Sequence, residues 1–321
     1  MKTILVTGAG GFIGQAVCRN LLKDYKIIAF DRIPLAERGK NFISIKGNIA
    51  DKDKLESICT DYFPDVVVHC AGIAHQSIFR PLDKEAYDNI NFTATKNLAR
   101  IVFRINPEAM FIFLSSISVY GESAKQFRIN EKADCQPTSD YAVSKLNAEI
   151  ALKNIYDSNM ITKIDIFRLA PVYDRAWSLN LEKRVFGPQK FFYLKFGSGE
   201  QRMSILSRQN LVDFIRYRIE KQDGPNFNIF NVCDEKACSF NEIIRIFQKS
   251  GVQPNKMVIK IPLFFIRFLT MGGARIFPRK ASWINSFYYK LANSLVFDNK
   301  RMLGTGFCPT QSLSSVFGKE K

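Results

Sequence analysis

The sequence contains little histidine and no long uninterrupted apolar segment. Only His69 and His75 occur among its 321 residues, which argues against histidine-based metal sites and against a Ser-His-Asp triad. Proton transfer must then rely on Tyr, Lys, Asp, Glu or Ser. No apolar run reaches the roughly 18 residues needed to span a bilayer, and the longest, residues 261–271, is interrupted by Arg267.

Paired cysteines and an N-terminal signal are also missing. The seven cysteines are scattered without a CxxC pair, so we expect neither a disulfide framework nor a zinc site, and no metal. Residues 1–14 do not resemble a signal peptide, because Lys2 is their only basic residue and a glycine cluster soon interrupts the apolar stretch. We therefore expect a cytoplasmic protein.

Acidic residues are outnumbered by basic ones, 30 to 46, for a formal net charge of +16. Residues 256–301 alone carry nine Lys/Arg and one acid, Asp298, among many aromatic residues. A basic balance favours an anionic partner such as nucleic acid, a membrane surface or a phosphorylated metabolite. For residues 256–301 we keep three interpretations open: an ordinary basic surface, a weak peripheral contact with a membrane, and a surface that faces a polyphosphate.

Short apolar runs alternate with longer amphipathic stretches over the first 170 residues. The runs predict strands at 2–7, 26–31, 66–70, 110–115 and 163–169, and the stretches predict helices at 12–24, 83–104 and 141–157. Apolar strands that alternate with helices are typical of an α/β fold with a Rossmann-type, doubly wound parallel sheet.

The pattern becomes less regular after residue 170. A helix at 209–221, a strand at 227–232 and a helix at 239–250 are predicted, and we expect them to pack against a nucleotide-binding domain formed by residues 1–170. Residues 171–208 and 252–321 contain most of the irregular, Gly- and Pro-marked sequence. They predict a smaller α/β substrate-binding lobe.

A glycine-rich turn follows the first predicted strand. Gly8, Gly11 and Gly14 have a GxxGxxG spacing, and a predicted helix begins within the motif. Such a turn lets the backbone approach a pyrophosphate, which the free N–H groups and positive dipole of the helix N-terminus can bind. Phe12 and Ile13, inside the motif, belong to the same predicted dinucleotide site.

Asp31 ends the second predicted strand, 23 residues after Gly8. A carboxylate at that position can accept a hydrogen bond from a ribose 2′-hydroxyl and repels a 2′-phosphate, so NAD is favoured over NADP. The neighbouring Arg32 acts in the other direction, because an arginine can accommodate that phosphate.

A tyrosine and a lysine four residues apart form the candidate catalytic pair. Tyr141 and Lys145 share one face of a predicted helix. The ammonium is expected to lower the pKa of the phenol from its usual value near 10, so that the tyrosine can shuttle a proton at neutral pH. Ser116, 25 residues earlier at the end of a predicted strand, can hold the reacting oxygen. A second pair, Tyr217 and Lys221, lacks these neighbours and predicts a solvated helix face.

Taken together, these motifs resemble the extended short-chain dehydrogenases/reductases of the NAD-dependent sugar-nucleotide epimerase/dehydratase family, including its UDP-glucose 4-epimerase-like members, over nearly the whole length. The resemblance implies that Ser116, Tyr141 and Lys145 are catalytic and that the cofactor is NAD. It also implies contacts to the cofactor by Asn48, Ile49, Ala71, Gly72, Asn91 and Pro171, and contacts to the substrate by Ser116, Asn180 and Arg202. His75 lies in a loop that faces the substrate in this family.

Ile117 and Ser118 bear on which reaction the family resemblance implies. The 4,6-dehydratases of the family carry Asp-Glu there, and an isoleucine and a serine cannot perform that acid–base work. The resemblance then implies a 4-epimerase that transiently oxidises C4 of a nucleoside-diphosphate sugar, first of all a UDP-sugar, for surface polysaccharides. It implies a homodimer and no nucleic acid partner. An NAD(P)H-dependent 4-keto-sugar reductase and a catalytically silent NAD-binding scaffold remain alternatives.

Overall fold

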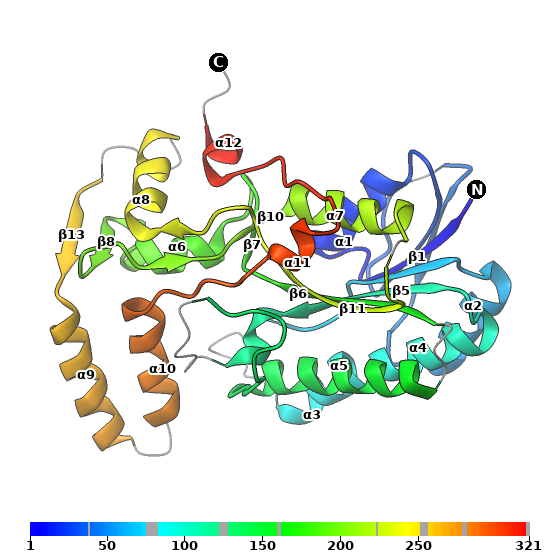
Figure 1. Ribbon diagram of the computed structural model, residues 1–321, viewed down its shortest axis with the longest axis horizontal. Coiled ribbons are helices and arrows are strands. Elements are labelled where there is room, and N and C mark those ends of the chain that lie inside the picture. Colours follow the sequence, from blue (N-terminus) through cyan, green and yellow to red (C-terminus); the bar gives the residue numbers. More distant parts are fainter. Residues whose placement is uncertain are drawn as a thin grey trace. The chain divides into compact units, whose positions relative to one another are not determined.

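The computed structural model describes residues 1–37, 39–74, 83–121, 128–158, 162–222, 224–250, 256–277 and 281–318. The chain divides into two compact units, which we describe in turn, and Figure 1 traces its elements. The first unit comprises Met1–Gly121, Asp134–Arg168 and Val212–Phe230. The second comprises Glu122–Ala133, Leu169–Leu211 and Asn231–Lys321.

The first unit is built on a seven-stranded sheet with the order β11-β6-β5-β4-β1-β2-β3. Its strands are β1 (Thr3–Thr7), β2 (Lys26–Asp31), β3 (Phe42–Lys46), β4 (Val66–His69), β5 (Met110–Ser116), β6 (Lys163–Leu169) and β11 (Phe227–Val232). The pairs from β3 through to β5 are parallel. Because both faces of such a sheet are covered, its central strands are almost continuously apolar and buried. The predicted Rossmann-type α/β class is confirmed.

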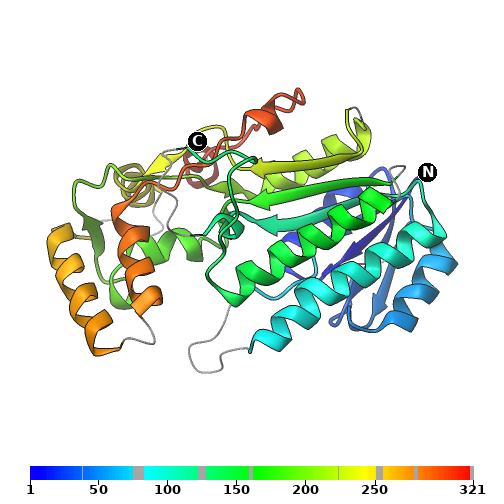
Figure 2. The same cartoon turned by 60° about the horizontal axis from the view of Figure 1, so that its bottom comes forward.

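Helices cover both faces of this sheet (Figure 2). One face carries α2 (Lys52–Tyr62), α4 (Ala94–Ile105) and α5 (Asp140–Ser158), and the other carries α1 (Phe12–Leu21) and α7 (Arg208–Glu220). The main core lies between the sheet and the first group, with fully buried side chains such as Leu5, Ile28, Leu98, Phe111 and Leu152. On the other face, Arg216 of α7 donates to Asn20 of α1 at 2.9 Å.

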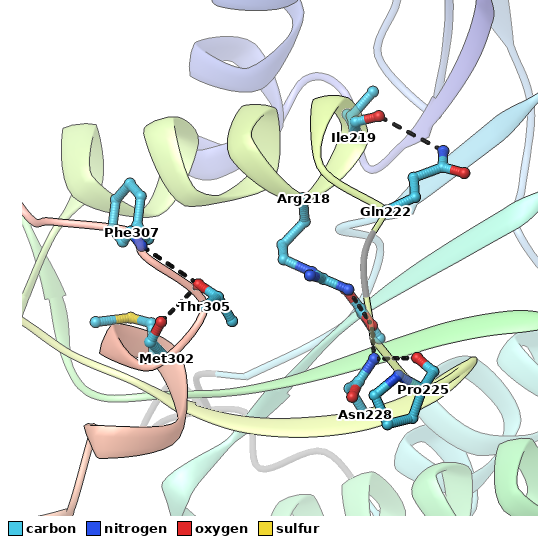
Figure 3. Close-up of polar contacts among 9 residues, drawn as sticks. Arg218, Ile219, Gln222, Pro225, Asn228, Met302, Thr305 and Phe307 are labelled. Atoms are coloured by element: carbon cyan, nitrogen blue, oxygen red, sulfur yellow. Dashed lines mark hydrogen bonds and ion pairs between the residues drawn. The ribbon is translucent and has the colours of Figure 1, made fainter.

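A buried polar cluster ties α7 to the outer strands β6 and β11. Arg218 donates to Asp165 at 2.7 Å, and both side chains are at most 5% exposed. Asn228 donates to the other oxygen of Asp165 at 2.9 Å and to the carbonyl of Pro225 at 2.7 Å (Figure 3). Because every member has a hydrogen-bonding partner, the buried charges are compensated. Figure 3 also shows Thr305 donating to the Met302 carbonyl in the second unit.

Two local features of the first unit were not predicted. The sequence predicted one helix at 83–104, but the structure has α3 (Lys84–Tyr87), a π-helical turn η1 (Asp88–Thr93) and then α4. Strand β3 and helix α2, the latter capped by the Asp51 carboxylate, also went unidentified. Only one of the five β3 residues, Phe42, is buried, so its apolar signal is weak.

The second unit combines six helices within its described residues with three two-stranded sheets, β7–β10, β9–β12 and β8–β13. Its strands are β7 (Val172–Tyr173), β8 (Tyr193–Phe196), β9 (Arg202–Met203), β10 (Leu206–Ser207), β12 (Cys238–Ser239) and β13 (Val258–Ile261). Its helices are α6 (Leu179–Val185), α8 (Phe240–Lys249), α9 (Leu263–Ile276), α10 (Ala281–Ala292), α11 (Lys300–Leu303) and α12 (Leu313–Phe317), with the short 3-10 turn η3 (Pro188–Lys190).

The core of the second unit is aromatic and includes Tyr173, Phe186, Tyr193, Phe247 and Phe317. Helix α8 contributes to it through Phe240, Ile243, Ile244 and Phe247. The sequence grouped residues 209–250 with the first domain, whereas the structure gives most of α7 and β11 to the first unit and α8 to the second. In the described ranges, no helix is long and apolar enough to cross a membrane.

Candidate functional site

The glycine turn after β1 depends on close backbone approach. Gly8 has a φ of +67°, and a Cβ there would lie 2.5 Å from the backbone nitrogen of Ala71, just after β4. A Cβ on Gly14 would lie 2.1 Å from the Gly8 carbonyl oxygen. Side chains are therefore excluded at both positions. The fold thus brings the backbones of Gly8, Gly14 and Ala71 close together.

Helix α1 begins in this turn with an uncompensated N-terminus. Its N-cap residue, Gly11, offers no side-chain hydrogen bond, and its first turn, which starts with Phe12 and Ile13, contains no acidic residue. By contrast, Asp51 caps α2 and Ser239 caps α8. The positive end of the α1 dipole can therefore attract an anion, and a pyrophosphate fits this position.

The Asp31 carboxylate is fixed beside the same turn. Its Oδ2 accepts a hydrogen bond from the Gly10 amide, and its Oδ1 accepts one from the Ile33 amide, both at 3.0 Å. These bonds hold the carboxylate at the carboxyl end of β2, where a ribose hydroxyl can reach it. The adjacent Arg32 is exposed.

Two predicted cofactor residues follow the neighbouring strand β3. Asn48 is exposed, and its Oδ1 accepts from the Ala50 amide at 3.1 Å. Ile49 is 8% exposed and joins the main core. Because β2 and β3 are parallel, these residues and Asp31 lie at the same edge of the sheet.

Asn91 links three segments around the candidate site. Its buried side chain donates to the Ile73 carbonyl at 3.0 Å and to Ser144 at 3.1 Å, and it accepts from the Ile73 amide at 2.9 Å. A Cβ on Gly72 would lie 3.0 Å from Asn91 Oδ1 and 3.2 Å from Lys145 Nζ. The π-helical turn η1 thus places Asn91 against the segment after β4 and against α5, next to Lys145.

Ser116 and Tyr141 interact directly, and Ser118 orients the pair. Ser116 ends β5, and its Oγ accepts hydrogen bonds from the Ser118 amide at 3.2 Å and the Ser118 hydroxyl at 2.9 Å. A hydroxyl has two acceptor positions and one proton to donate. With both positions filled by Ser118, the Ser116 proton is available to the Tyr141 oxygen, with which Ser116 hydrogen-bonds.

The Lys145 side chain, on the same helix as Tyr141, is almost fully buried. Its Nζ donates to the Leu114 carbonyl at 2.9 Å and lies 4.7 Å from the centre of the Phe113 ring. Removal from water lowers the pKa of Lys145 to about 8, partly offset by nearby acidic groups such as Glu149. The amine is therefore neutral in a large fraction of molecules in mildly alkaline solution.

The Tyr141 phenol does not follow the expectation from the sequence. Burial raises its pKa above the ordinary value, the Ser116 hydroxyl lowers it, and the nearby Tyr87 raises it. Lys145 was expected to lower this pKa, but its charge is not among the causes in the structure. The Ser116 hydroxyl lowers the pKa of Tyr141 instead, and this effect is smaller than the increase caused by burial.

Two buried polar groups near the site were not among the predicted site residues. His69 lies between Thr7, at 2.6 Å, and Thr95, at 2.8 Å, and burial followed by the charge of Lys145 lowers its pKa to about 3. It therefore stays neutral and acts as a structural link. Glu149, one turn after Lys145, pairs with Arg168 at 2.7 Å. The four-residue spacing of Lys145 and Glu149 was the available sequence signal.

Three further candidates, Pro171, Asn180 and Arg202, lie in the second unit. The Pro171 carbonyl accepts from the Leu206 amide at 3.0 Å, and Asn180 is half-buried on α6. The Arg202 side chain is 49% exposed on β9 and lies 3.8 Å from Glu242. His75 lies outside the described residues. Tyr217, the tyrosine of the second pair, is half-buried on α7 rather than fully solvated.

Comparison with known proteins gives a family match over most of the chain. The model of the NAD dependent epimerase/dehydratase family matches residues 4–233. A UDP-glucose 4-epimerase of Vibrio cholerae is 31% identical, over 76% of this chain and 74% of its own. An N-acetyl-alpha-D-glucosaminyl-diphospho-ditrans,octacis-undecaprenol 4-epimerase of Escherichia coli O157:H7 is 24% identical, over 97% of this chain and 92% of its own.

Solved structures show the same fold at lower identity. The UDP-Glc/GlcNAc 4-epimerase of Campylobacter jejuni superposes with a TM-score of 0.76 at 19% identity, covering 99% of this chain and 97% of its own. At such identity the likeness shows the fold alone, and the chemistry must be argued from the residues.

Proposed function

Given that this chain belongs to the NAD dependent epimerase/dehydratase family, we propose that it is a 4-epimerase acting on a sugar carried by a nucleoside diphosphate. As a member of this family it is an enzyme with NAD as cofactor. The first unit is then the NAD-binding domain, and the second provides the substrate-binding lobe.

The residues around the glycine turn support the cofactor site. The uncapped N-terminus of α1 suits the pyrophosphate, and the fixed Asp31 carboxylate suits an unphosphorylated ribose. On the family pattern, Gly72, Asn91 and Lys145 would lie beside the nicotinamide half. When bound, NAD supplies the hydride acceptor and donor.

The orientation of Ser116 by Ser118 is the observation that carries the catalytic proposal. It directs one hydroxyl proton toward the Tyr141 oxygen and stabilises the phenolate. Tyr141 as phenolate takes the proton from the sugar 4-hydroxyl and later returns one to the same oxygen. On the family pattern, Lys145 would hold the nicotinamide ribose. When the sugar is bound, the Ser116 proton can pass its hydrogen bond from the Tyr141 oxygen to the sugar 4-oxygen and hold it there.

The same serines support epimerisation over dehydration. Loss of water across C5 and C6 needs an acid and a base in addition to the tyrosine. In the family's dehydratases these groups occupy the positions of Ile117 and Ser118. Here Ser118 uses its hydroxyl proton on Ser116, and an isoleucine cannot transfer protons. The substrate therefore keeps its C6 oxygen.

A polyprenol diphosphate is the second candidate carrier of the sugar. The relative that aligns with 97% of this chain is named for an undecaprenol-linked substrate, whereas the relative named for UDP-glucose aligns with 76%. Both carriers present a diphosphate, for which Arg202 on β9 provides a bidentate donor. Its side chain is only weakly held by Glu242 at 3.8 Å.

The experiment incubates the purified protein with UDP-glucose, UDP-N-acetylglucosamine or polyprenyl-diphospho-N-acetylglucosamine, without added NADH. The expected result is an equilibrium mixture of C4 epimers with one carrier class, measured by the H3–H4 coupling in the proton NMR spectrum. If every substrate stays unchanged while NAD is bound normally, the epimerase proposal fails and a silent NAD-binding protein is favoured.

A further inference from the structure

Helix α9 exposes an unusual number of large apolar side chains. Phe264, Phe265, Phe268, Leu269, Met271 and Ile276 are between 55% and 77% exposed, and so is Phe277 directly after the helix, at 59%. Single exposed apolar residues are common on soluble proteins, but a contiguous group marks an interaction surface. We call this group, Phe264 to Phe277, the α9 apolar face.

The apolar face is not the side by which α9 packs onto its own unit. Helix α9 packs against α10, and both views show the two side by side (Figures 1 and 2). The more protected residues of α9 are Leu263, Ile266, Thr270, Gly273 and Ala274. Their spacing of three, four, three and one places them on one side of a helix with 3.6 residues per turn. The exposed apolar residues occupy the opposite side, so α9 carries apolar residues on its uncovered side as well as on its covered side.

All charged residues in the sequence stretch that contains α9 are basic. No Asp or Glu occurs between Ile243 and Phe297, whereas the same stretch carries Lys249, Lys256, Lys260, Arg267, Arg275, Arg279, Lys280 and Lys290. Arg267 and Arg275 lie on α9 and are exposed, and the Arg267 guanidinium lies 6.0 Å from the centre of the Tyr288 ring on α10. Exposed arginines beside a strongly apolar helix face are typical of helices that lie in the interface of an anionic bilayer.

We infer that the α9 apolar face docks onto the surface of an anionic lipid bilayer, with α9 lying in the plane of the interface. A helix of 14 residues is about 21 Å long, too short to span the hydrocarbon core. Its phenylalanines, leucine and methionine enter the acyl boundary, while Arg267 and Arg275 extend to the phosphates of the headgroups. This inference goes beyond the proposed function and does not depend on it.

A second copy of the chain is a poorer occupant for the same surface. Two α9 apolar faces placed together would bring the bordering lysines and arginines of both copies close to each other. With no carboxylate between Ile243 and Phe297 to neutralise them, the like charges would repel across the interface. Anionic headgroups remove this cost, because they supply the missing negative charge.

The test measures co-sedimentation of the full chain with vesicles of phosphatidylcholine alone or of phosphatidylcholine with 30% phosphatidylglycerol. The protein should sediment with the anionic vesicles at low salt, bind neutral vesicles far more weakly, and be partly released at high salt. Phe264→Glu/Phe268→Glu should lower the partition coefficient about a hundredfold, because two aromatic anchors on one side of the helix are replaced by negative charges.

The matched control is Phe63→Glu/Ile150→Glu, which places two charges on apolar side chains of the first unit that are 53% and 51% exposed. It should bind vesicles like the unmodified chain, and both variants should keep the unmodified far-ultraviolet circular dichroism. If the unmodified chain does not sediment with vesicles of any lipid composition, the inference is overturned. An equal loss of vesicle binding in the control variant would also overturn it. Self-association that the α9 variant abolishes, without vesicle binding, would assign the face to a second copy instead.

Discussion

Ser118 illustrates how one residue sets the chemistry of this site. Its amide and its hydroxyl both donate to Ser116, so the Ser116 proton is left for the Tyr141 oxygen. The sequence identified Ser116 and Tyr141 and noted only that Ser118 is not an acid. Its orienting role depends on the short 3-10 turn after β5 (Ile117–Tyr120), which Ser116 caps by accepting from the Ser118 amide. The sequence analysis did not predict that turn.

Removal of the phenol oxygen of Tyr141 tests its role as the proton shuttle. Tyr141→Phe should fold and bind NAD but lose several orders of magnitude in turnover, since the central acid–base group is removed. Tyr217→Phe is the matched control, because Tyr217 also precedes a lysine by four residues on a helix. Steady-state rates and NAD titration measure both effects. Similar activity of the two variants would show that the wrong tyrosine, or the wrong mechanism, has been assigned.

The buried Lys145 amine predicts a pH-dependent stability. Its pKa is lowered to about 8 in the folded chain from an ordinary value of 10.5, so between these pH values the unfolded chain binds more protons. The contribution of Lys145 to the free energy of unfolding therefore rises from pH 8 to 10.5 and is least favourable below pH 8.

Urea unfolding of the unmodified chain and of Lys145→Met measures this contribution. The free energy of unfolding of Lys145→Met minus that of the unmodified chain should be higher at pH 7 than at pH 10.5, by up to about 3 kcal/mol. The difference between the two proteins isolates Lys145, because other buried groups titrate equally in both. A difference that does not change with pH would show that the amine is not desolvated.

At the scale of elements, strong periodicity made most of the first unit predictable. The predicted strand 26–31 matches β2, because a buried strand of a parallel sheet is apolar on both faces. The predicted strand 163–169 matches β6, although this strand also carries the buried Asp165 and Arg168. Strand β3 escaped prediction because it is largely uncovered. The π-helical turn η1 was not predicted either. It depends on the tertiary packing around the buried Asn91, and such packing leaves no local sequence pattern.

The glycine turn predicts a sharp steric effect. Gly14→Ala should destabilise the first unit by about 3 kcal/mol or more, because the added Cβ would lie 2.1 Å from the Gly8 carbonyl oxygen and the turn would have to open. NAD binding should weaken with it. Gly272→Ala on α9 is the control, since no atom lies within 4 Å of its added Cβ and alanine favours the helix by about 1 kcal/mol. Thermal unfolding of Gly14→Ala at the unmodified temperature would contradict this account of the turn.

At the scale of the whole molecule, the sequence indicated more about chemistry than about surfaces. In the proposed function, the cofactor and the reacting atoms set the positions of the glycines, the carboxylate, the tyrosine and the lysine, so their spacing is visible in one chain. The function of residues 256–301 was left open, because apolar residues predict a buried helix as readily as an exposed one. Only the exposure of α9 separates these interpretations.

The central claim is that hydride leaves C4 of the sugar and returns to the same carbon within one molecule of enzyme. The most direct measurement uses a substrate deuterated at C4, with the product analysed by mass spectrometry and NMR while absorbance at the NADH band is followed. An epimerase should give the C4 epimer with its deuterium retained and no external NADH consumed. Stoichiometric oxidation of NADH with a 4-keto sugar nucleotide, without interconversion of the C4 epimers, would contradict the claim and identify the enzyme as a reductase.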